Sequence, residues 1–391
     1  MVQNSQKIQF IHSLVEIIKI ANVGPLYLLY DGQNFIKLEN PIYFCRNNNL
    51  KTFDMWLRRV KVEFGDVLKK SNCKILIFAA HEIGNEFIEH VMPNKLIYML
   101  GKLIGRENVF CIINNNTTSQ TNLLNKFQSD NILYCNYWEM HTVSICKSLK
   151  YKPNFKVLNV KKDYLCSVNK LKILRLGILL ELYHRNLWKK GYVNLLSHPT
   201  HAPKSFDYCF HGYQLDRLID KTKAAEILKL LPFSYDISIQ PGDDAWDKFG
   251  FSPIDNSLMT QIEQQYAKFY INSYCSIVME THDGVCQPAD YFLTEKTVKP
   301  LYWGHPFVIL SQFGDLGRLK QQGYETFNDY CDEAYDQEKD WKLRIKKVCD
   351  ALEQLIANKD SKIGAILEYN HNHLLNICNN NFTYLYNMLG K

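Results

Sequence analysis

The chain has 391 residues, more than the roughly 250 to 300 at which a single hydrophobic core stops growing, so we expect two domains. Hydrophobic residues make up 46% of the sequence and charged residues 22%, a balance that excludes extensive disorder. The 46 basic and 40 acidic residues give a net charge of +6, which is too small and too dispersed to indicate a nucleic-acid-binding protein. This charge suits a ligand that carries a pyrophosphate, and the alternative is a mildly basic solvated surface.

The N-terminal segment, residues 1–24, has apolar residues at helical spacing, but polar residues interrupt it repeatedly and no small-residue cleavage site follows. It therefore predicts neither a signal peptide nor a membrane anchor, and we expect a cytoplasmic protein without a transmembrane segment. The 12 cysteines are scattered and include no C-x-x-C pair. We expect buried, reduced thiols rather than a zinc ribbon or a redox motif.

Short apolar runs typical of β-strands recur along the chain, mostly separated by stretches long enough for helices. The first series comprises residues 26–30, 74–80, 109–113 and 132–136, and the second comprises 164–168, 192–197, 275–280 and 306–310. This alternation predicts the α/β class, with a largely parallel sheet in each half of the chain.

A basic, proline-containing stretch, residues 147–163, separates the two series and is expected to connect two domains. The predicted bounds are 1–155 for the N-terminal α/β domain, 156–355 for the C-terminal domain and 356–391 for a helical tail, for which packing against the N-terminal domain is one arrangement. A helix pair is predicted at 212–231. A long amphipathic helix is predicted from Trp341, because apolar residues recur there at helical spacing: Ile345, Val348, Cys349 and Leu352.

Residues 274–336 carry the densest set of chemistry-bearing side chains. An apolar run ends at Glu280, a predicted helix opens with Thr294, Glu295 and Lys296, and a second apolar run follows Gly-His-Pro. This pattern predicts a β-loop-α-β unit, and ligands bind at the carboxyl ends of strands in open α/β sheets. Thr294 is suited to cap the helix, whose first N–H groups, together with Lys296, would suit a nucleotide diphosphate. The alternative is that Glu295 and Lys296 are ordinary surface charges.

Two further candidates follow predicted strands. Asn169 ends the run 164–168 and Arg175 lies on the next predicted helix, which indicates a phosphate site at a strand-to-helix turn. The alternative for Arg175 is a solvent-facing position. Glu82 follows the run 74–80 and could act as a general base, while the alternative is a polar loop or a helix cap.

The stretch from Glu280 to Asp336 resembles the donor-binding core of the fucosyltransferase-like glycosyltransferases, whose pattern runs acid, short loop, Thr-Glu-Lys, helix and proline-bearing strand. A broader resemblance covers residues 164–355. The resemblance implies a GT-B architecture, in which two Rossmann-like domains face a cleft, residues 1–155 on the acceptor side and 156–355 holding the nucleotide sugar. It implies that Glu280 contacts the sugar or ribose, and that Glu295 and Lys296 contact ribose and phosphates.

Two positions depart from the family pattern: Thr281 stands where the family has Asn, and Phe292 where it has Tyr. Neighbouring His282 and Tyr291 are the candidates to supply the missing hydrogen bond. The expected donor-binding set is Asn169, Arg175, Glu280, His282, Tyr291, Thr294, Glu295 and Lys296, and the expected catalytic base is Glu82. The acids Glu333 and Asp336 resemble acids of some relatives, but we expect them to pack and to cap helices.

The resemblance implies a glycosyltransferase that moves a sugar from a nucleotide diphosphate sugar, with a GDP-fucose-like donor favoured, to a hydroxyl acceptor such as a glycan. The reaction would invert the anomeric centre without a metal or another cofactor. The absence of a D-x-D motif agrees with a donor site that no metal bridges. The alternative is a non-catalytic sugar-nucleotide or carbohydrate-binding protein with the same fold, which the departures at Thr281 and Phe292 support.

Overall fold

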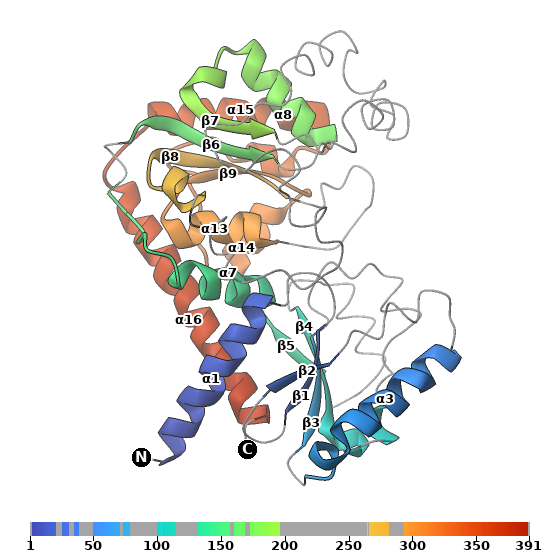
Figure 1. Ribbon diagram of the computed structural model, residues 1–391. Helices are drawn as coiled ribbons and strands as arrows, with labels where there is room; N and C mark the ends of the chain where they lie inside the picture. The colour runs from blue at the N-terminus through green and yellow to red at the C-terminus, as the bar shows by residue number, and fades with distance from the viewer. Residues whose placement is uncertain are drawn as a thin grey trace. The chain divides into compact units, whose positions relative to one another are not determined.

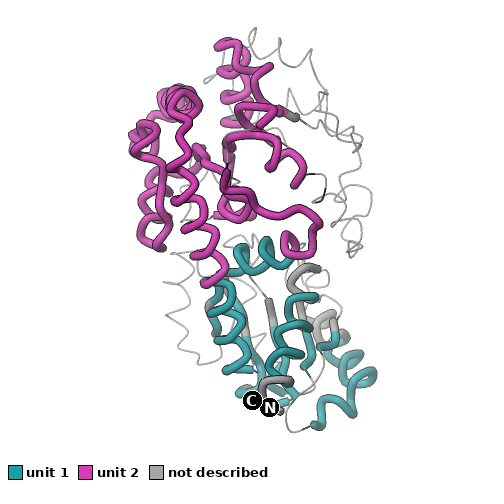
Figure 2. Tube along the Cα trace, turned by 90° about the vertical axis from the view of Figure 1, so that its left-hand side faces the viewer, with its two compact units in different colours: residues 1–144, 377–391 teal, residues 145–376 magenta. Residues whose placement is uncertain are grey.

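The computed structural model describes residues 2–20, 26–30, 35–38, 50–70, 73–78, 100–102, 104–114, 132–156, 160–168, 173–195, 264, 266–280 and 293–389. The chain divides into two compact units (Figure 2), residues 1–144 with 377–391 as unit 1 and residues 145–376 as unit 2. Compared with the expected domains, residues 145–155 belong to unit 2, and the expected tail is divided between the units. The expected helix pair at 212–231 lies outside the described residues.

Unit 1 contains a five-stranded sheet in the order β2-β1-β3-β4-β5. Its strands are β1 (Leu26–Tyr30), β2 (Phe35–Leu38), β3 (Lys74–Phe78), β4 (Val109–Asn114) and β5 (Ile132–Cys135). The pairs β3–β4 and β4–β5 are parallel, whereas β1 is antiparallel to both of its neighbours. The sheet is therefore mixed, and the expectation of a largely parallel sheet holds only for β3, β4 and β5.

The antiparallel side of this sheet follows from the length of one connection. Only residues 31–34 join β1 to β2, and so short a link closes a hairpin, because parallel strands need a crossover of about a dozen residues or more. Since β1 lies between β2 and β3 and opposes both, β2 and β3 run in the same direction. Helix α3 (Leu50–Leu68) connects them in the chain.

The core of unit 1 includes side chains from both chain ends. Helix α1 (Val2–Ile20) and the end of helix α16 (Ile363–Leu389) meet where the rings of Phe10 and Tyr386 lie 5.3 Å apart. The Nζ of Lys74 donates a 2.7 Å hydrogen bond to the carbonyl of Leu389. The last part of α16 is thus tied to the first sheet. Helix α7 (Tyr137–Lys147), which follows β5, is buried from Tyr137 to Cys146.

Unit 2 contains a four-stranded sheet in which every pair is parallel, as the second series of apolar runs predicts. Its strands, in the order β7-β6-β8-β9, are β6 (Lys162–Val168), β7 (Gly191–Leu195), β8 (Ser273–Met279) and β9 (Phe307–Leu310). Every residue of β8 is buried, which is typical of a strand whose sheet is covered on both faces.

Helices cover both faces of this sheet (Figure 1): α8 (Ile173–His184) and α15 (Trp341–Ala357) lie on one face, and α13 (Glu295–Trp303) and α14 (Asp315–Gln321) on the other. The chain passes from β6 to β7 on one side of β6, and later to β8 and β9 on its other side. Right-handed crossovers in these two opposite directions place their helices on opposite faces of the sheet. The predicted amphipathic helix is confirmed as α15, with all four of its predicted apolar residues buried. The guanidinium of Arg185 joins α8 to α15 through Asp350, at 2.6 Å, and Glu353, at 2.8 Å.

Within the described residues, helices that combine the length and the apolar character needed to cross a membrane are absent. The eight cysteines whose side chains are described are buried, as expected: Cys73, Cys135, Cys146, Cys166, Cys275, Cys331, Cys349 and Cys378. Burial raises the pKa of the Cys166 thiol to about 12, so this thiol is protonated and unreactive at neutral pH.

Candidate functional site

The parallel sheet of unit 2 reverses its strand order between β6 and β8. Strand β6 is followed in the chain by β7 on one side, whereas β8 and β9 lie on its other side. The neighbouring strands β6 and β8 pair in parallel, so their carboxyl ends lie at the same edge. In open α/β sheets, ligands bind at such a switch point. Arg175, on the helix after β6, and Glu280, directly after β8, both follow strands that end there.

Glu280 is 2% exposed, and its carboxylate is held by the start of α13. Its Oε1 accepts hydrogen bonds from the backbone N–H of Thr294, at 3.1 Å, and from Oγ1 of Thr297, at 2.5 Å. Its Oε2 accepts a 2.6 Å hydrogen bond from Oγ1 of Thr294. A buried carboxylate is costly unless such bonds satisfy it. Both oxygens of Glu280 are engaged, and the side chain fixes the beginning of α13.

Thr294 is the N-cap of α13, which confirms the predicted cap. Its backbone is extended, with φ −117°, and its Oγ1 accepts from the N–H of Lys296 at 3.3 Å. The N–H of Thr297 donates to the carbonyl of Thr294 at 3.1 Å. The N–H groups of Lys296 and Thr297 were predicted to be available to a phosphate, but both donate to Thr294. The carboxylates of Glu280 and Glu295 also lie at this positive end of the helix, where negative charge is favourable.

Glu295 and Lys296 form an ion pair of 2.9 Å, with side chains 28% and 30% exposed. The Nζ of Lys296 also donates to Oγ1 of Thr294 at 3.2 Å. Burial opposes ionisation of Glu295, but the positive charges of Lys296 and Lys299 prevail and lower its pKa to about 2. Glu295 is therefore anionic at neutral pH. The pair is half-buried and oriented by the N-cap, which distinguishes it from a freely solvated surface pair.

Arg175 lies in the first turn of α8 and is 7% exposed. Its positive charge acts on the thiol of Cys166 in β6, where it opposes the effect of burial on the pKa. The alternative of a solvent-facing Arg175 is therefore wrong. The side chain is almost buried on the helix that follows β6, and the phosphate site expected there stays a prediction.

A second buried acid, which was not predicted from the sequence, is the first residue of α14. Asp315 is fully buried, and it accepts from the N–H of Gln312 at 3.1 Å and from Nη1 of Arg318 at 3.3 Å. Burial raises its pKa to about 7, and the charges of Glu280 and Asp336 add to the rise. The signal in the sequence was an acid that follows a glycine at the start of a helix, but its burial depends on the tertiary structure.

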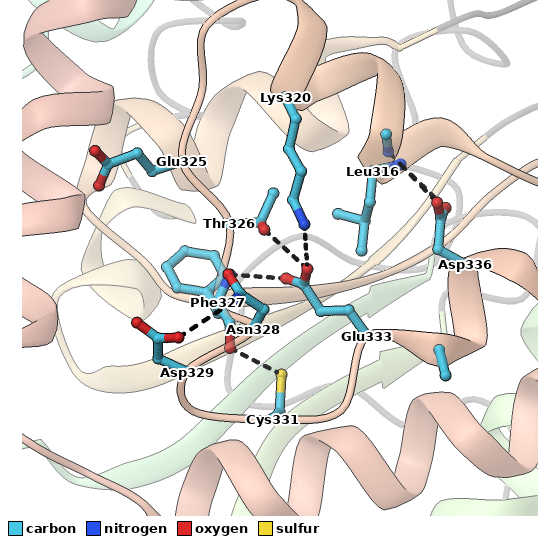
Figure 3. A network of polar contacts seen from close by, with 12 residues as sticks. Leu316, Lys320, Glu325, Thr326, Phe327, Asn328, Asp329, Cys331, Glu333 and Asp336 are labelled. Atoms are coloured by element: carbon cyan, nitrogen blue, oxygen red, sulfur yellow. Dashed lines mark hydrogen bonds and ion pairs between the residues drawn. The ribbon is translucent and has the colours of Figure 1, made fainter.

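The acids beyond α14 stabilise the local fold, as predicted (Figure 3). Glu333 accepts from Oγ1 of Thr326 at 2.8 Å, from the N–H of Phe327 at 2.7 Å and from Nζ of Lys320 at 3.0 Å. Asp336 accepts from the N–H of Leu316 at 3.0 Å, in the first turn of α14. These carboxylates pack and cap, and both are engaged by the protein itself.

The structure thus brings Glu280, Thr294, Glu295 and Lys296 together, and it places Arg175 on the helix after the neighbouring strand. The other predicted site residues, Glu82, Asn169, His282 and Tyr291, lie outside the described residues. Among the residues that are described, three or more His, Cys, Asp or Glu side chains do not gather in a way that could hold a metal ion.

Comparison with known proteins adds no relative: no family model matches the chain, and neither a curated protein nor a solved structure matches it. A functional proposal for this chain therefore rests on its sequence motif and on the geometry of unit 2.

Proposed function

We propose that the protein is a glycosyltransferase of the fucosyltransferase-like type, which transfers a sugar from a nucleotide diphosphate to a hydroxyl acceptor such as a glycan. The observation that carries the proposal is the β8–α13–β9 unit, with Thr294, Glu295 and Lys296 at the start of α13 beside the switch point of a parallel sheet. Ligands bind at this edge in open α/β sheets, and the charges there can recognise an anion.

Lys296 and Arg175 would bind the pyrophosphate of the donor. Each charge-assisted hydrogen bond contributes about 1.5 to 3 kcal/mol, and such bonds strengthen as the leaving phosphate gains negative charge. Glu295, anionic at neutral pH, is suited to accept hydrogen bonds from ribose hydroxyls. In this proposal a GDP-fucose-like donor is favoured, and the two units correspond to the two domains of a GT-B enzyme.

The proposed reaction is a direct displacement that inverts the anomeric centre. The acceptor oxygen forms a bond to the anomeric carbon as the bond from that carbon to the phosphate oxygen breaks, and the nucleoside diphosphate leaves with the electron pair. Glu82 is the proposed base for the acceptor proton. Lys296 and Arg175 balance the charge of the leaving group, so the proposal requires no metal.

A thermal-shift screen of the purified chain against GDP, UDP, CMP, ADP and their common sugar conjugates tests the donor site. We expect one nucleotide to raise the melting temperature, and we expect Lys296→Ala to remove this rise while it leaves the melting temperature without ligand nearly unchanged. Lys342→Ala, on an exposed part of α15, is the matched control and should keep the rise. Absence of any shift, or an equal loss in both variants, contradicts the proposed site.

Catalysis is tested separately with the nucleotide sugar that binds. An inverting transferase of this kind hydrolyses its donor slowly without acceptor, whereas a non-catalytic sugar-nucleotide-binding protein leaves it intact. Release of nucleoside diphosphate that depends on Lys296 supports the enzyme. Binding without release, over a long incubation at high protein concentration, supports the alternative to which the departures at Thr281 and Phe292 point.

A further inference from the structure

Thr297 lies in the first turn of α13 and contacts two residues of the candidate site, Glu280 and Thr294. It is fully buried, its Oγ1 donates to Oε1 of Glu280 at 2.5 Å, and its N–H bonds to the carbonyl of Thr294. A buried carboxylate that accepts three hydrogen bonds has one orientation, because each change of rotamer would leave polar groups unsatisfied. Thr297 therefore contributes to the fixed position of Glu280.

The same network reaches Lys296 through Thr294. The hydroxyl of Thr294 has one proton, which it donates to Oε2 of Glu280 at 2.6 Å. Its acceptor side is then directed away from Glu280, and it receives the backbone N–H of Lys296 at 3.3 Å and the Nζ of Lys296 at 3.2 Å. Reversing the hydroxyl would break these two bonds, so the position of Lys296 depends on Glu280.

We infer that Glu280 and Thr297 are positioning residues, which act through Thr294 to hold Lys296 in one conformation at the carboxyl edge of the sheet. Glu280 does not itself bind the sugar or the ribose, in contrast to the role that the family resemblance implies. The binding of a phosphate by Lys296 rests on the proposed function, whereas the hydrogen-bond network that holds Lys296 does not.

The network is tested without a ligand by amide hydrogen exchange in the full chain. Thr297→Val removes the hydroxyl at nearly constant volume, and Thr297→Ser retains it. We expect the Lys296 amide to exchange about tenfold faster in Thr297→Val, a size typical of directly coupled neighbours, and within about twofold of the unchanged chain in Thr297→Ser. Equal exchange in all three proteins overturns the inference. If Thr297→Val does not fold, Thr297→Cys, a weaker donor, takes its place with the same two outcomes.

The effect on ligand binding is tested with GDP and guanosine, measured by NMR titration. Because Lys296 would contact phosphate, Thr297→Val should weaken GDP binding about tenfold and leave guanosine binding unchanged, and Thr297→Ser should restore GDP binding. An equal loss for both ligands marks a general structural defect and overturns positioning through Lys296. If the unchanged chain binds neither ligand nor another nucleotide, the proposed function fails, and the exchange result alone decides the inference. If GDP binds and exchange does not respond, the inference fails and the proposed function stands.

Discussion

Oγ1 of Thr294 lies 2.6 Å from Oε2 of Glu280, so the N-cap of α13 is bonded directly to the residue that follows β8. The two residues are 14 positions apart in the chain. A side chain that caps a helix and also satisfies a buried carboxylate links the strand to the helix. The hydroxyl of Thr294 is therefore shared between the strand end and the helix start that form the candidate site.

Glu280→Gln should lower the free energy of unfolding by about 1 to 3 kcal/mol. The amide would place a donor against groups that donate to the carboxylate, and a buried unsatisfied polar group costs about that much. Urea unfolding measures the loss. The control is Glu368→Gln on the exposed part of α16, which should stay within about 0.5 kcal/mol of the unchanged chain. Equal effects of the two changes would show that the network around Glu280 does not contribute to stability.

Eight strands could be predicted because each is a short, continuous apolar run, and a buried strand needs such a run whatever surrounds it. Strand β2 (Phe35–Leu38) was missed, since Lys37 interrupts its short apolar run and the strand pairs as the second arm of a hairpin. The antiparallel direction of β1 was missed for the same reason. Strand pairing is a relationship between distant segments, which periodicity within one segment does not reveal.

The cap at Thr294 was predictable because a Thr before a helix signals its N-terminus locally. The burial of the polar side chains could not be predicted from the sequence. Arg and Asp side chains are mostly exposed in proteins, yet Arg175 and Asp315 are buried here. Burial of a charge depends on partners far away in sequence, so the structure was needed to exclude a solvent-facing Arg175 and to find Asp315.

Asp336→Ala should destabilise the protein by about 1 to 2 kcal/mol, the usual cost of losing a cap. The N-cap of helix α14 is Gly314, which provides no side-chain cap, and Asp336 accepts instead from the N–H of Leu316 at 3.0 Å (Figure 3). It also accepts from the N–H of Gly317 at 3.4 Å. Urea unfolding measures the loss. Asp329→Ala, at an exposed position, should change stability by less than about 0.5 kcal/mol. A loss no larger than that of the control would contradict the capping role.

His305→Gln should flatten the pH dependence of stability on the acid side. The ring of His305 is buried between Oγ of Ser276, 2.9 Å from Nδ1, and the carbonyl of Tyr270, which accepts from Nε2. Burial lowers its pKa from 6.5 to about 4, against the opposing effect of the backbone hydrogen bonds. Between these values the unfolded chain binds more protons, so the stability contributed by the neutral ring is lost as pH falls. Urea unfolding from pH 7.5 to 4 should show the difference in free energy between the unchanged chain and the variant shrinking. A constant difference would contradict the assignment.

The stability of the unchanged chain relative to Asp315→Asn should fall as pH rises, which is the opposite of the trend expected for His305. Burial, with the charges of Glu280 and Asp336, raises the pKa of Asp315 from 3.8 to about 7, although Arg318 opposes the rise. Between these two values the folded chain binds more protons than the unfolded chain, so the contribution of Asp315 to stability falls as pH rises and is constant above about pH 7. One pKa unit corresponds to about 1.4 kcal/mol, which sets an upper bound of roughly 4 kcal/mol for the whole window.

The variant carries no titrating group at this position, so its stability relative to the unchanged chain should improve steadily from pH 4 to pH 7. Urea unfolding of both proteins across this range measures the difference, and it separates Asp315 from groups such as His305 because those titrate equally in both. Asp329→Asn, at an exposed position, is the matched control for the loss of one carboxyl group. If the curves for Asp315→Asn and the unchanged chain run parallel, then Asp315 is ionised throughout this range, which contradicts the raised pKa of its buried carboxyl.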